Sequence, residues 1–467
     1  MPGKYNPRYV SSPQFSIFMH VDALDAISPV DGRYRDRCNE LAPFFSEGAL
    51  IRYRIRIEIE YLVALGAFSL PKIDSMNNKT VAKLRNIYRR LDETGIREIK
   101  KIEKTTNHDV KAVEYYLRKQ LIEMGLKQYS EFVHFGLTSQ DINNTAVPLS
   151  IREALTSVYL PLLTNLEKKL ASLAREWKEI PMLAHTHGQP ASPTRLGKEM
   201  AVFAERIRSQ RMLLMQVPHS AKFGGATGNF NAHVAAYPKH NWIAFADTFV
   251  SGLGLHRTPV TTQIEPYDNL AALFDAMKRI NNVMLDLSRD AWLYISMNYF
   301  KQTIRKGETG SSTMPHKVNP IDFENAEGNL GMANAVFEHL SAKLPVSRLQ
   351  RDLSDSTVLR NAGVPMAHTV IAFKSLLKGL NQIKANTEAI NKDLEANWAV
   401  VAEGIQTILR REGVANAYES LKSLTRKHHT VGKKEITAFI EKLKVSPAVK
   451  KELRALTPFT YTGVFKR

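Results

Sequence analysis

The segment GSSTMPHKVNP, residues 310–320, places two hydroxyls, an ammonium group and an amide within a few residues of one another. Its glycine allows unusual backbone angles, and its two prolines exclude a regular helix or strand. An ordinary turn would account for those residues, but not for Lys317 and Asn319 beside Ser311 and Ser312. Because Lys317 and Asn319 carry donors that suit a carboxylate, we predict a catalytic loop that closes over a doubly charged substrate and removes a proton from carbon.

A second segment, HTHGQPASPTRLGKE at residues 185–199, carries two histidines separated by one residue. His185 and His187 could bind a metal together, but no clear third ligand accompanies them, so a zinc site is disfavoured. A structural histidine and a catalytic histidine both remain open, because spacing alone does not choose between them. The glycines, prolines and threonines predict that most of this segment is a loop.

Two segments combine helix-starting signals with groups that suit an anion. In KTTNHDVKAVE, Asn107 or Asp109 can cap a helix, which leaves His108 near a helix N-terminus, where anions bind well. In FGLTSQDINN, Thr138 and Ser139 form a capping signal. An ordinary capping turn would explain both segments, so the residues alone do not establish binding.

Long spans without proline must position these segments. The spans run between Pro71 and Pro148, Pro266 and Pro315, and Pro365 and Pro447. They predict long helices, and apolar residues at steps of three and four in residues 267–299 predict one helix packed in a bundle. Residues 51–60, IRYRIRIEIE, alternate apolar and charged residues as a half-buried strand does, but good helix formers and a stripe at four-residue spacing favour a helix.

The composition is that of an ordinary globular protein with a large core, since 44% of the 467 residues are hydrophobic and 24% are charged. No apolar run reaches the roughly 18 to 20 residues of a membrane span, and Met1 to Val30 lacks the features of a secretion signal. The single cysteine, Cys38, cannot form an internal disulfide. These features predict a cytoplasmic protein without a membrane partner.

The formal net charge of +18 is unusual and permits binding of nucleic acid, of anionic membranes or of an anionic substrate. Much of the excess lies in residues 426–454, where lysines and apolar residues recur at helical spacing. Such charge runs most often mark solvated helix faces. Because recognisable nucleic-acid motifs are missing from the sequence, we predict no nucleic-acid partner.

The segment GSSTMPHKVNP closely resembles the signature of the fumarase, aspartase and argininosuccinate lyase superfamily. TTNHDVKAVE and THGQP resemble the adenylosuccinate lyase branch of it, in its longer bacterial form. The resemblance runs from about Ile27 to near the C-terminus through DGRY, GNFNAH, TTQIEP, NPIDFEN and RDLSDSTVLRN. It implies a carbon–nitrogen lyase of the amidine-lyase type.

The implied reaction is β-elimination of fumarate in purine nucleotide biosynthesis. Adenylosuccinate would give AMP, and succinylaminoimidazole carboxamide ribotide (SAICAR) would give AICAR, with no metal or other cofactor. Argininosuccinate lyase or fumarase activity is one competing interpretation. A basic nucleic-acid-binding or scaffold protein with an inherited lyase fold is another, supported by net charge alone.

The resemblance also implies a role for each matching residue. Ser311 would be the base and His187, not His185, the general acid, protonated with help from a carboxylate such as Glu265. A substrate carboxylate would be held by Thr138, Ser139, Lys317 and Asn319. The nucleotide phosphate would be bound by Arg33, Tyr34, Arg351, Ser356 and Arg360, with His108 and Ser312 nearby. Further polar groups would be held by Gln263 and Asn325, and the remaining substrate-binding positions are Asn107, Asp109, Thr357, Val358 and Leu359.

The fold implied by the resemblance is all-α, with three domains and a long central helical bundle. The expected domains are an N-terminal helical domain (1–126), a central bundle domain (127–370) with the signature loop 307–320, and a C-terminal helical domain (371–467). The family packs its central helices into a larger bundle in a homotetramer, in which each active site draws loops from three subunits. The physical support in this sequence is the set of long amphipathic helices, whose apolar faces would otherwise meet water.

Overall fold

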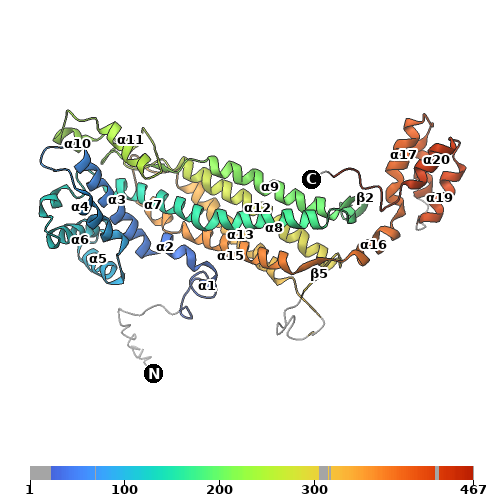
Figure 1. The fold of residues 1–467 in the computed structure, drawn as a ribbon, viewed down its shortest axis with the longest axis horizontal. Coiled ribbons are helices and arrows are strands. Elements are labelled where there is room, and N and C mark those ends of the chain that lie inside the picture. Colours follow the sequence, from blue (N-terminus) through green and yellow to red (C-terminus); the bar gives the residue numbers. More distant parts are fainter. Residues whose placement is uncertain (1–22, 69, 304–313, 315–316, 426–430, 466–467) are drawn as a thin grey trace, which may run out of the picture.

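The structure is a computed structural model that describes residues 23–68, 70–303, 314, 317–425 and 431–465. Helices dominate it, as predicted, and the strands of the described residues form three separate two-stranded sheets. Figure 1 shows an elongated molecule, in which long helices run side by side between a group of shorter helices at one end and a small helical unit at the other. Within the described ranges, no helix combines the length and apolar character needed to cross a bilayer.

Of the N-terminal helices, drawn in blue and cyan, α3 to α6 build one end of the molecule, and α1 and α2 lie along the bundle (Figure 1). The N-terminal helices are α1 (Arg35–Cys38), α2 (Ala42–Phe45), α3 (Glu47–Ala67), α4 (Asn78–Arg89), α5 (Glu93–Thr106) and α6 (Asp109–Glu123), followed by a 3₁₀ helix at Lys127–Phe132. The proline-free span after Pro71 therefore holds several helices and not one long rod. The reason is that Asp92 and His108 cap new helices, and Asn107, with φ of 52°, ends α5 in the left-handed conformation.

Helix α3 confirms the helical prediction for residues 51–60. The alternation of apolar and charged residues does not reflect a half-buried strand. Arg54 and Glu58 are buried as fully as their isoleucine neighbours. The Arg54 guanidinium donates to Asp109 at 2.6 Å, and Glu58 bonds the His134 ring at 2.6 Å. Arg54 and Glu58 are thus inward-facing partners of other segments.

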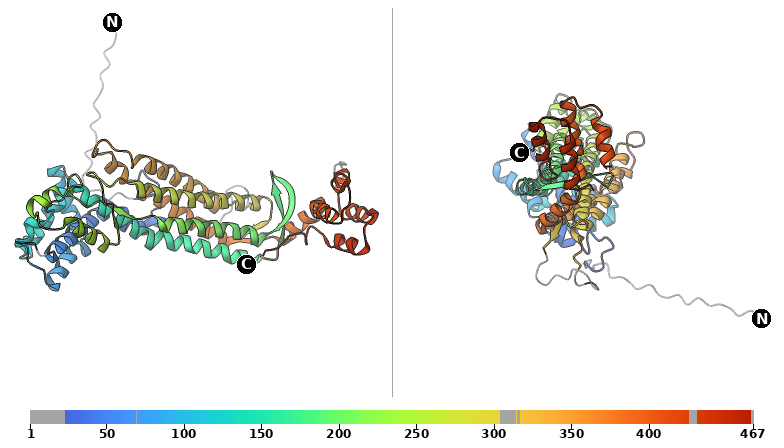
Figure 2. Two further views of the ribbon diagram at one scale, coloured as in Figure 1. Left: turned by 90° about the horizontal axis from the view of Figure 1, so that it is seen from above. Right: turned by 90° about the vertical axis from the view of Figure 1, so that its right-hand side faces the viewer.

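Six long helices form the central bundle, and Figure 2 shows them running side by side. They are α7 (Ser139–Ala154), α8 (Leu160–Glu176), α9 (Leu196–Gln216), α12 (Asp268–Ser296), α13 (Ile321–Lys343) and α15 (Gly363–Gln382). Helix α12 confirms the prediction for residues 267–299, and Met277, Ile280 and Met284 of its stripe are buried. Pro148 lies inside α7, and a π-helical turn at Leu155–Tyr159 carries the chain on into α8.

The prediction of a loop after residue 185 is wrong over most of its length. Strand β1 (Pro181–Thr186) pairs with β2 (Gln189–Arg195) as an antiparallel hairpin, and α9 begins at Leu196. The backbone hydrogen bonds of this polar segment are formed by strand pairing. Its prolines and glycine had instead favoured a loop. Residues 27–34 and 223–230 form loops.

Short elements connect the long helices. These are β3 (Ser220–Ala221) paired in parallel with β4 (His256–Arg257), α10 (Asn231–Ala236), α11 (Trp242–Gly252), α14 (Ser354–Leu359), and β5 (Phe300–Gln302) paired antiparallel with β6 (Ile383–Ala385). The C-terminal unit contains α16 (Thr387–Ala396), a 3₁₀ helix at Trp398–Val401, α17 (Ala402–Arg411), α18 (Ala417–Thr425), α19 (Lys433–Lys442) and α20 (Pro447–Ala455).

Buried apolar residues gather in three clusters: one in the bundle, one in the N-terminal helices with residues 221–255, and one in residues 398–453. In the third cluster Ile436 and Ile440 face inward, whereas Lys433 and Lys434 are exposed. The basic C-terminal stretch thus forms solvated helix faces where it is described, as predicted. The proposed domain limits 1–126, 127–370 and 371–467 remain predictions.

Candidate active site

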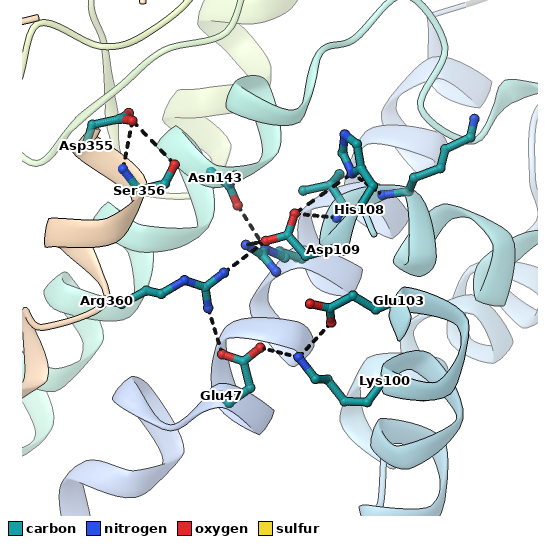
Figure 3. A network of polar contacts seen from close by, with 12 residues as sticks. Glu47, Lys100, Glu103, His108, Asp109, Asn143, Asp355, Ser356 and Arg360 are labelled. Carbon is teal, nitrogen blue, oxygen red and sulfur yellow. Dashed lines mark hydrogen bonds and ion pairs between the residues drawn. The ribbon is translucent and has the colours of Figure 1, made fainter. Parts of the chain in front are cut away.

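A network of charged groups joins the first residues of α3 and α6 to the end of α14 (Figure 3). The Arg360 guanidinium donates to Glu47 at 2.9 Å and to Asp109 at 3.1 Å. Burial opposes ionisation of Asp109, but Arg54 and Arg360 hold the pKa of its carboxyl below its ordinary value. The Arg360 guanidinium is therefore held in place by two carboxylates with which an entering phosphate would compete.

A cavity of about 190 Å³ adjoins this network. Its wall includes Glu47, Arg54, Gln140, Ser356 and Arg360, with phenylalanine and leucine side chains on the other sides. The Nη1 atom of Arg54 and the Nε2 atom of Gln140 are buried without a hydrogen-bond partner among the described residues. The cavity therefore offers hydrogen-bond donors next to apolar surface, a combination that suits an organic anion.

His108 lies at the N-cap of α6, where its Nδ1 accepts a hydrogen bond from the backbone N–H of Lys111 at 3.2 Å. The predicted helix start is confirmed, although the capping atom belongs to His108 and not to Asn107 or Asp109. About half of the His108 side chain is exposed, with a value of 52%. The capping Nδ1 also lies 3.9 Å from the Asp109 carboxylate, so His108 adjoins the charged network (Figure 3).

Three of the predicted binding residues meet beside α14. Arg351 donates to the Gln263 side chain at 3.3 Å and to the Ser356 hydroxyl at 3.2 Å. The other positions assigned to this helix are Thr357, Val358 and Leu359, of which Val358 and Leu359 pack against the bundle core. Arg351 and Ser356 thus form one cluster of donors a short helix away from Arg360.

Thr138 and Ser139 begin α7 through a capping box. The Asp141 carboxylate accepts the Thr138 backbone N–H at 2.8 Å. Asp141 is fully buried and forms an ion pair with the equally buried Lys222 at 2.7 Å, and it also accepts the backbone N–H of Gly224 at 2.8 Å. The segment that carries Thr138 and Ser139 is consequently tied to residues 222–225 through one carboxylate.

Tyr34 and Asn325 meet at the start of α13. The Asn325 amide donates to the Tyr34 hydroxyl at 3.2 Å and accepts from the Ser375 hydroxyl at 2.8 Å. Arg33 is exposed beside Tyr34, with its guanidinium 5.9 Å from the Tyr34 ring centre. These two predicted phosphate ligands therefore lie with Asn325.

His187 occupies the tip of the β1–β2 hairpin. Both His187, with φ of 53°, and Gly188, with φ of 73°, adopt the left-handed conformation that a two-residue hairpin turn requires. His187 is exposed, and the hairpin lies at the end of the bundle away from α6 (Figure 1). Glu265 is not its neighbour in this chain, because the Glu265 carboxylate is buried and bonded to Thr258 and to the backbone of Tyr267.

The signature loop is described only in part, and Ser311 and Ser312 lie outside the described residues. Lys317 is exposed and Asn319 half-buried, and Gln302 of β5 donates to the Val318 carbonyl at 3.0 Å. One chain thus holds predicted site residues in separate places: around α6, α7 and α14, around Tyr34, around Lys317, and at the hairpin tip.

Sequence reasoning missed Glu47, Arg54 and Lys222, which touch or support predicted site residues. The signal for Arg54 was present, because charged residues alternate with apolar ones in residues 51–60, but the pattern did not say which of them is buried. Lys222 precedes a glycine-rich loop and carries no motif of its own. In the described part of the chain, no group of three or more His, Cys, Asp or Glu side chains is arranged to hold a metal ion.

Comparison with protein families gives two adjoining matches. Residues 32–336 match the model of a lyase family, and residues 347–462 match the C-terminal region of adenylosuccinate lyase. A curated adenylosuccinate lyase from Dictyostelium discoideum is 54% identical, over 96% of this chain and 98% of that protein. The chain belongs to the adenylosuccinate lyase family. The adenylosuccinate lyase of Escherichia coli (strain K12) is 46% identical, over 95% of this chain and 98% of that protein.

Solved structures confirm the predicted all-α fold of the fumarase superfamily. A fumarate lyase from Mesorhizobium sp. BNC1 matches with a TM-score of 0.72 at 17% identity, covering 91% of this chain and 95% of that one. The 3-carboxy-cis,cis-muconate lactonizing enzyme from Pseudomonas putida matches with a TM-score of 0.71 at 19% identity, covering 92% and 95%. The predicted family and the predicted lyase class are confirmed with the fold.

Proposed function

We propose that this chain catalyses β-elimination of fumarate from adenylosuccinate, giving AMP, and from SAICAR, giving AICAR, as a cytoplasmic enzyme of purine nucleotide biosynthesis. The observation that carries the proposal is the family match over 96% of the chain. The donor clusters of Arg351, Ser356 and Arg360 support it, because a nucleotide phosphate needs charge-assisted hydrogen bonds of this kind.

Proton removal beside a carboxylate produces an enolate-like dianion, so the reaction needs a base and fixed positive potential at the carboxylate oxygens. In our proposal Ser311 takes the proton, and Lys317, Asn319, Thr138 and Ser139 bind the carboxylate. A serine hydroxyl is a weak base, and closure of the loop would activate it by excluding water and by bringing backbone donors and Lys317 close. His187 protonates the departing nitrogen of the purine or of the imidazole carboxamide. No metal or other cofactor takes part.

The phosphate end of the substrate would lie against Arg33, Tyr34, Arg351, Ser356 and Arg360, with His108 and Ser312 nearby. Gln263, Asn325 and the positions adjacent to these residues, Asn107, Asp109, Thr357, Val358 and Leu359, complete the proposed site. Because one chain keeps His187 far from α6 and α14, we propose a homotetramer whose active sites combine residues of different subunits (Figure 1).

The decisive experiment follows absorbance as adenylosuccinate is consumed, with argininosuccinate and malate as comparison substrates. We expect turnover of adenylosuccinate alone, and Ser311→Ala should lose fumarate release while it still binds substrate. Absent turnover by the wild-type protein, or turnover of argininosuccinate or malate in its place, would contradict the proposal. Unchanged turnover by Ser311→Ala would remove Ser311 from the role of base.

A further inference from the structure

A chain of three buried polar side chains links α7 to α14. The Asn144 amide donates to the Tyr267 hydroxyl at 2.6 Å, and that hydroxyl donates to the Asp355 carboxylate at 2.9 Å. Asn144, Tyr267 and Asp355 are each no more than 3% exposed. None of these residues belongs to the predicted active site, yet Asp355 adjoins Ser356 and lies one helical turn from Arg351.

Helix α14 depends on this chain for its position. It spans only Ser354–Leu359, and Asp355 is its one buried residue. The second oxygen of the Asp355 carboxylate accepts the backbone N–H of Ser356 at 2.7 Å and lies 3.9 Å from the Arg351 guanidinium. A helix this short buries little apolar surface, so the polar contact through Asp355 determines where its donors point.

Tyr267 is itself fixed by its surroundings. Its φ of 65° is unusual for a bulky residue, and its backbone N–H donates to the Glu265 carboxylate. The backbone N–H of Glu265 in turn donates to the Asn144 side chain at 2.9 Å. Asn144 therefore holds both the turn that precedes α12 and the hydroxyl that reaches α14.

We propose that Tyr267 is a positioning residue for phosphate recognition. It fixes the Asp355 carboxylate 3.9 Å from the Arg351 guanidinium, beyond hydrogen-bond distance, so that Arg351 keeps its donors available for the substrate. The Nε atom of Arg351 is buried without a hydrogen-bond partner among the described residues, so a released Asp355 carboxylate would find a ready partner there. This inference rests on the proposed function, because it assumes that Arg351 and Ser356 bind the nucleotide phosphate.

The test replaces Tyr267 by Phe, which removes the hydroxyl and keeps the ring. Loss of one hydrogen bond to a carboxylate corresponds to a change of about tenfold in an affinity. We expect KM for adenylosuccinate to rise about tenfold. The value of kcat should stay within about twofold, because the carbon–nitrogen bond that the enzyme cleaves lies away from the phosphate. Inorganic phosphate should inhibit the variant about tenfold more weakly, whereas inhibition by fumarate should not change.

Tyr53→Phe is the matched control, because Tyr53 is also buried and its hydroxyl also donates to a carboxylate, that of Glu153 at 2.6 Å. It should leave both inhibition constants unchanged. Equal losses for phosphate and fumarate in Tyr267→Phe would mean that the hydroxyl has a general structural role, and no loss for phosphate would also overturn the inference. A wild-type protein without adenylosuccinate turnover would instead refute the proposed function, so the two failures are distinguishable.

Discussion

The two ends of the central bundle treat their predicted site residues differently. Around α6, α7 and α14 three cations each pair with a carboxylate: Arg360 with Glu47, Arg54 with Asp109, and Lys222 with Asp141. At the other end His187 stands exposed at a hairpin tip. The side chains of the first region hold one another in place, whereas the second region exposes the histidine that we propose as the general acid.

This difference assigns different work to the two regions. Donors that neighbouring groups hold in place are already oriented when the ligand arrives, which suits the phosphate end of a nucleotide. A general acid must instead meet the leaving group within hydrogen-bond reach. In one chain the hairpin and α6 lie at opposite ends, so the acid would act on a nucleotide bound by a different subunit (Figure 1).

The largest expected effect, on kcat, comes from mixing subunits of two inactive variants, which tests whether residues of different subunits share one active site. His187→Asn and Ser311→Ala should each lower kcat by about 10²- to 10⁴-fold, because each removes one proton-transfer group. If a site takes these residues from different subunits, random reassembly of the two inactive variants restores about one quarter of the sites. The measurement is kcat per site after unfolding and refolding an equimolar mixture.

Variants refolded separately and then mixed without subunit exchange provide the control, and they should stay inactive. A reassembled mixture that is equally inactive would show that both residues act in the same subunit.

The buried pair of Asp141 and Lys222 tests the organisation of the first region. Asp141→Leu leaves the Lys222 ammonium buried without a countercharge, so we expect a loss of about 3 to 5 kcal/mol in the free energy of unfolding. The double variant with Lys222→Met should recover part of this loss, because no charge is then buried. Urea unfolding measures both values.

The exposed pair of Arg97 with Glu93 is the matched comparison, since both side chains are more than half exposed. Arg97→Ala should cost less than about 1 kcal/mol. Similar losses for Asp141→Leu and Arg97→Ala would mean that the buried pair does not stabilise this region.

Acidification should destabilise the region around α6 and α7 at a higher pH than it destabilises the C-terminal unit. Burial lowers the pKa of His233 to about 4 from an ordinary value of 6.5. Between these values the unfolded chain binds a proton that the folded chain does not, so stability falls as pH decreases from about 6.5 to 4, by about 3 kcal/mol in all. Hydrogen exchange should therefore accelerate in the cluster of residues 221–255 and less in residues 398–453.

His233→Gln removes this titration and should flatten the pH dependence of exchange in residues 221–255, even if it lowers stability at neutral pH. The Tyr61 hydroxyl, 3.1 Å from the His233 ring, can still bond the glutamine amide. An unchanged slope in the variant would assign the acid sensitivity to other groups.

The fold was predictable from sequence to the extent that its helices carry continuous apolar stripes. Helix α12 was found because its stripe is uninterrupted, and α3 because helix propensity outweighed the period-two pattern. The hairpin was missed, since its two strands are short and polar. They pair with each other across a turn of only two residues. The helix boundary at Asp92 was missed for a related reason: its cap divides a span that periodicity alone leaves continuous.

The candidate site was predictable wherever a motif carried its chemistry, as in Arg351, Ser356 and Arg360. Supporting residues were not, because Arg54, Tyr267 and Lys222 act through partners that folding brings from distant segments. Periodicity indicates that a position is buried but not which group it meets there. The distance between His187 and α14 could not be predicted either, since it depends on where the long helices begin and end.

Replacement of a glycine in the hairpin turn should have the smallest effect on kcat. A glycine in another part of the chain provides a direct comparison. Gly188 and Gly125 have φ of 73° and 72°, and a Cβ atom at either would meet nothing within 4 Å. Replacing either by Ala should therefore cost about 1 kcal/mol of stability, through left-handed backbone strain alone. Only Gly188→Ala should lower kcat, by a few fold, because it disturbs the turn that aims His187. Thermal unfolding and steady-state kinetics of both variants measure this, and equal kcat values would show that the hairpin tip does not determine the position of the general acid.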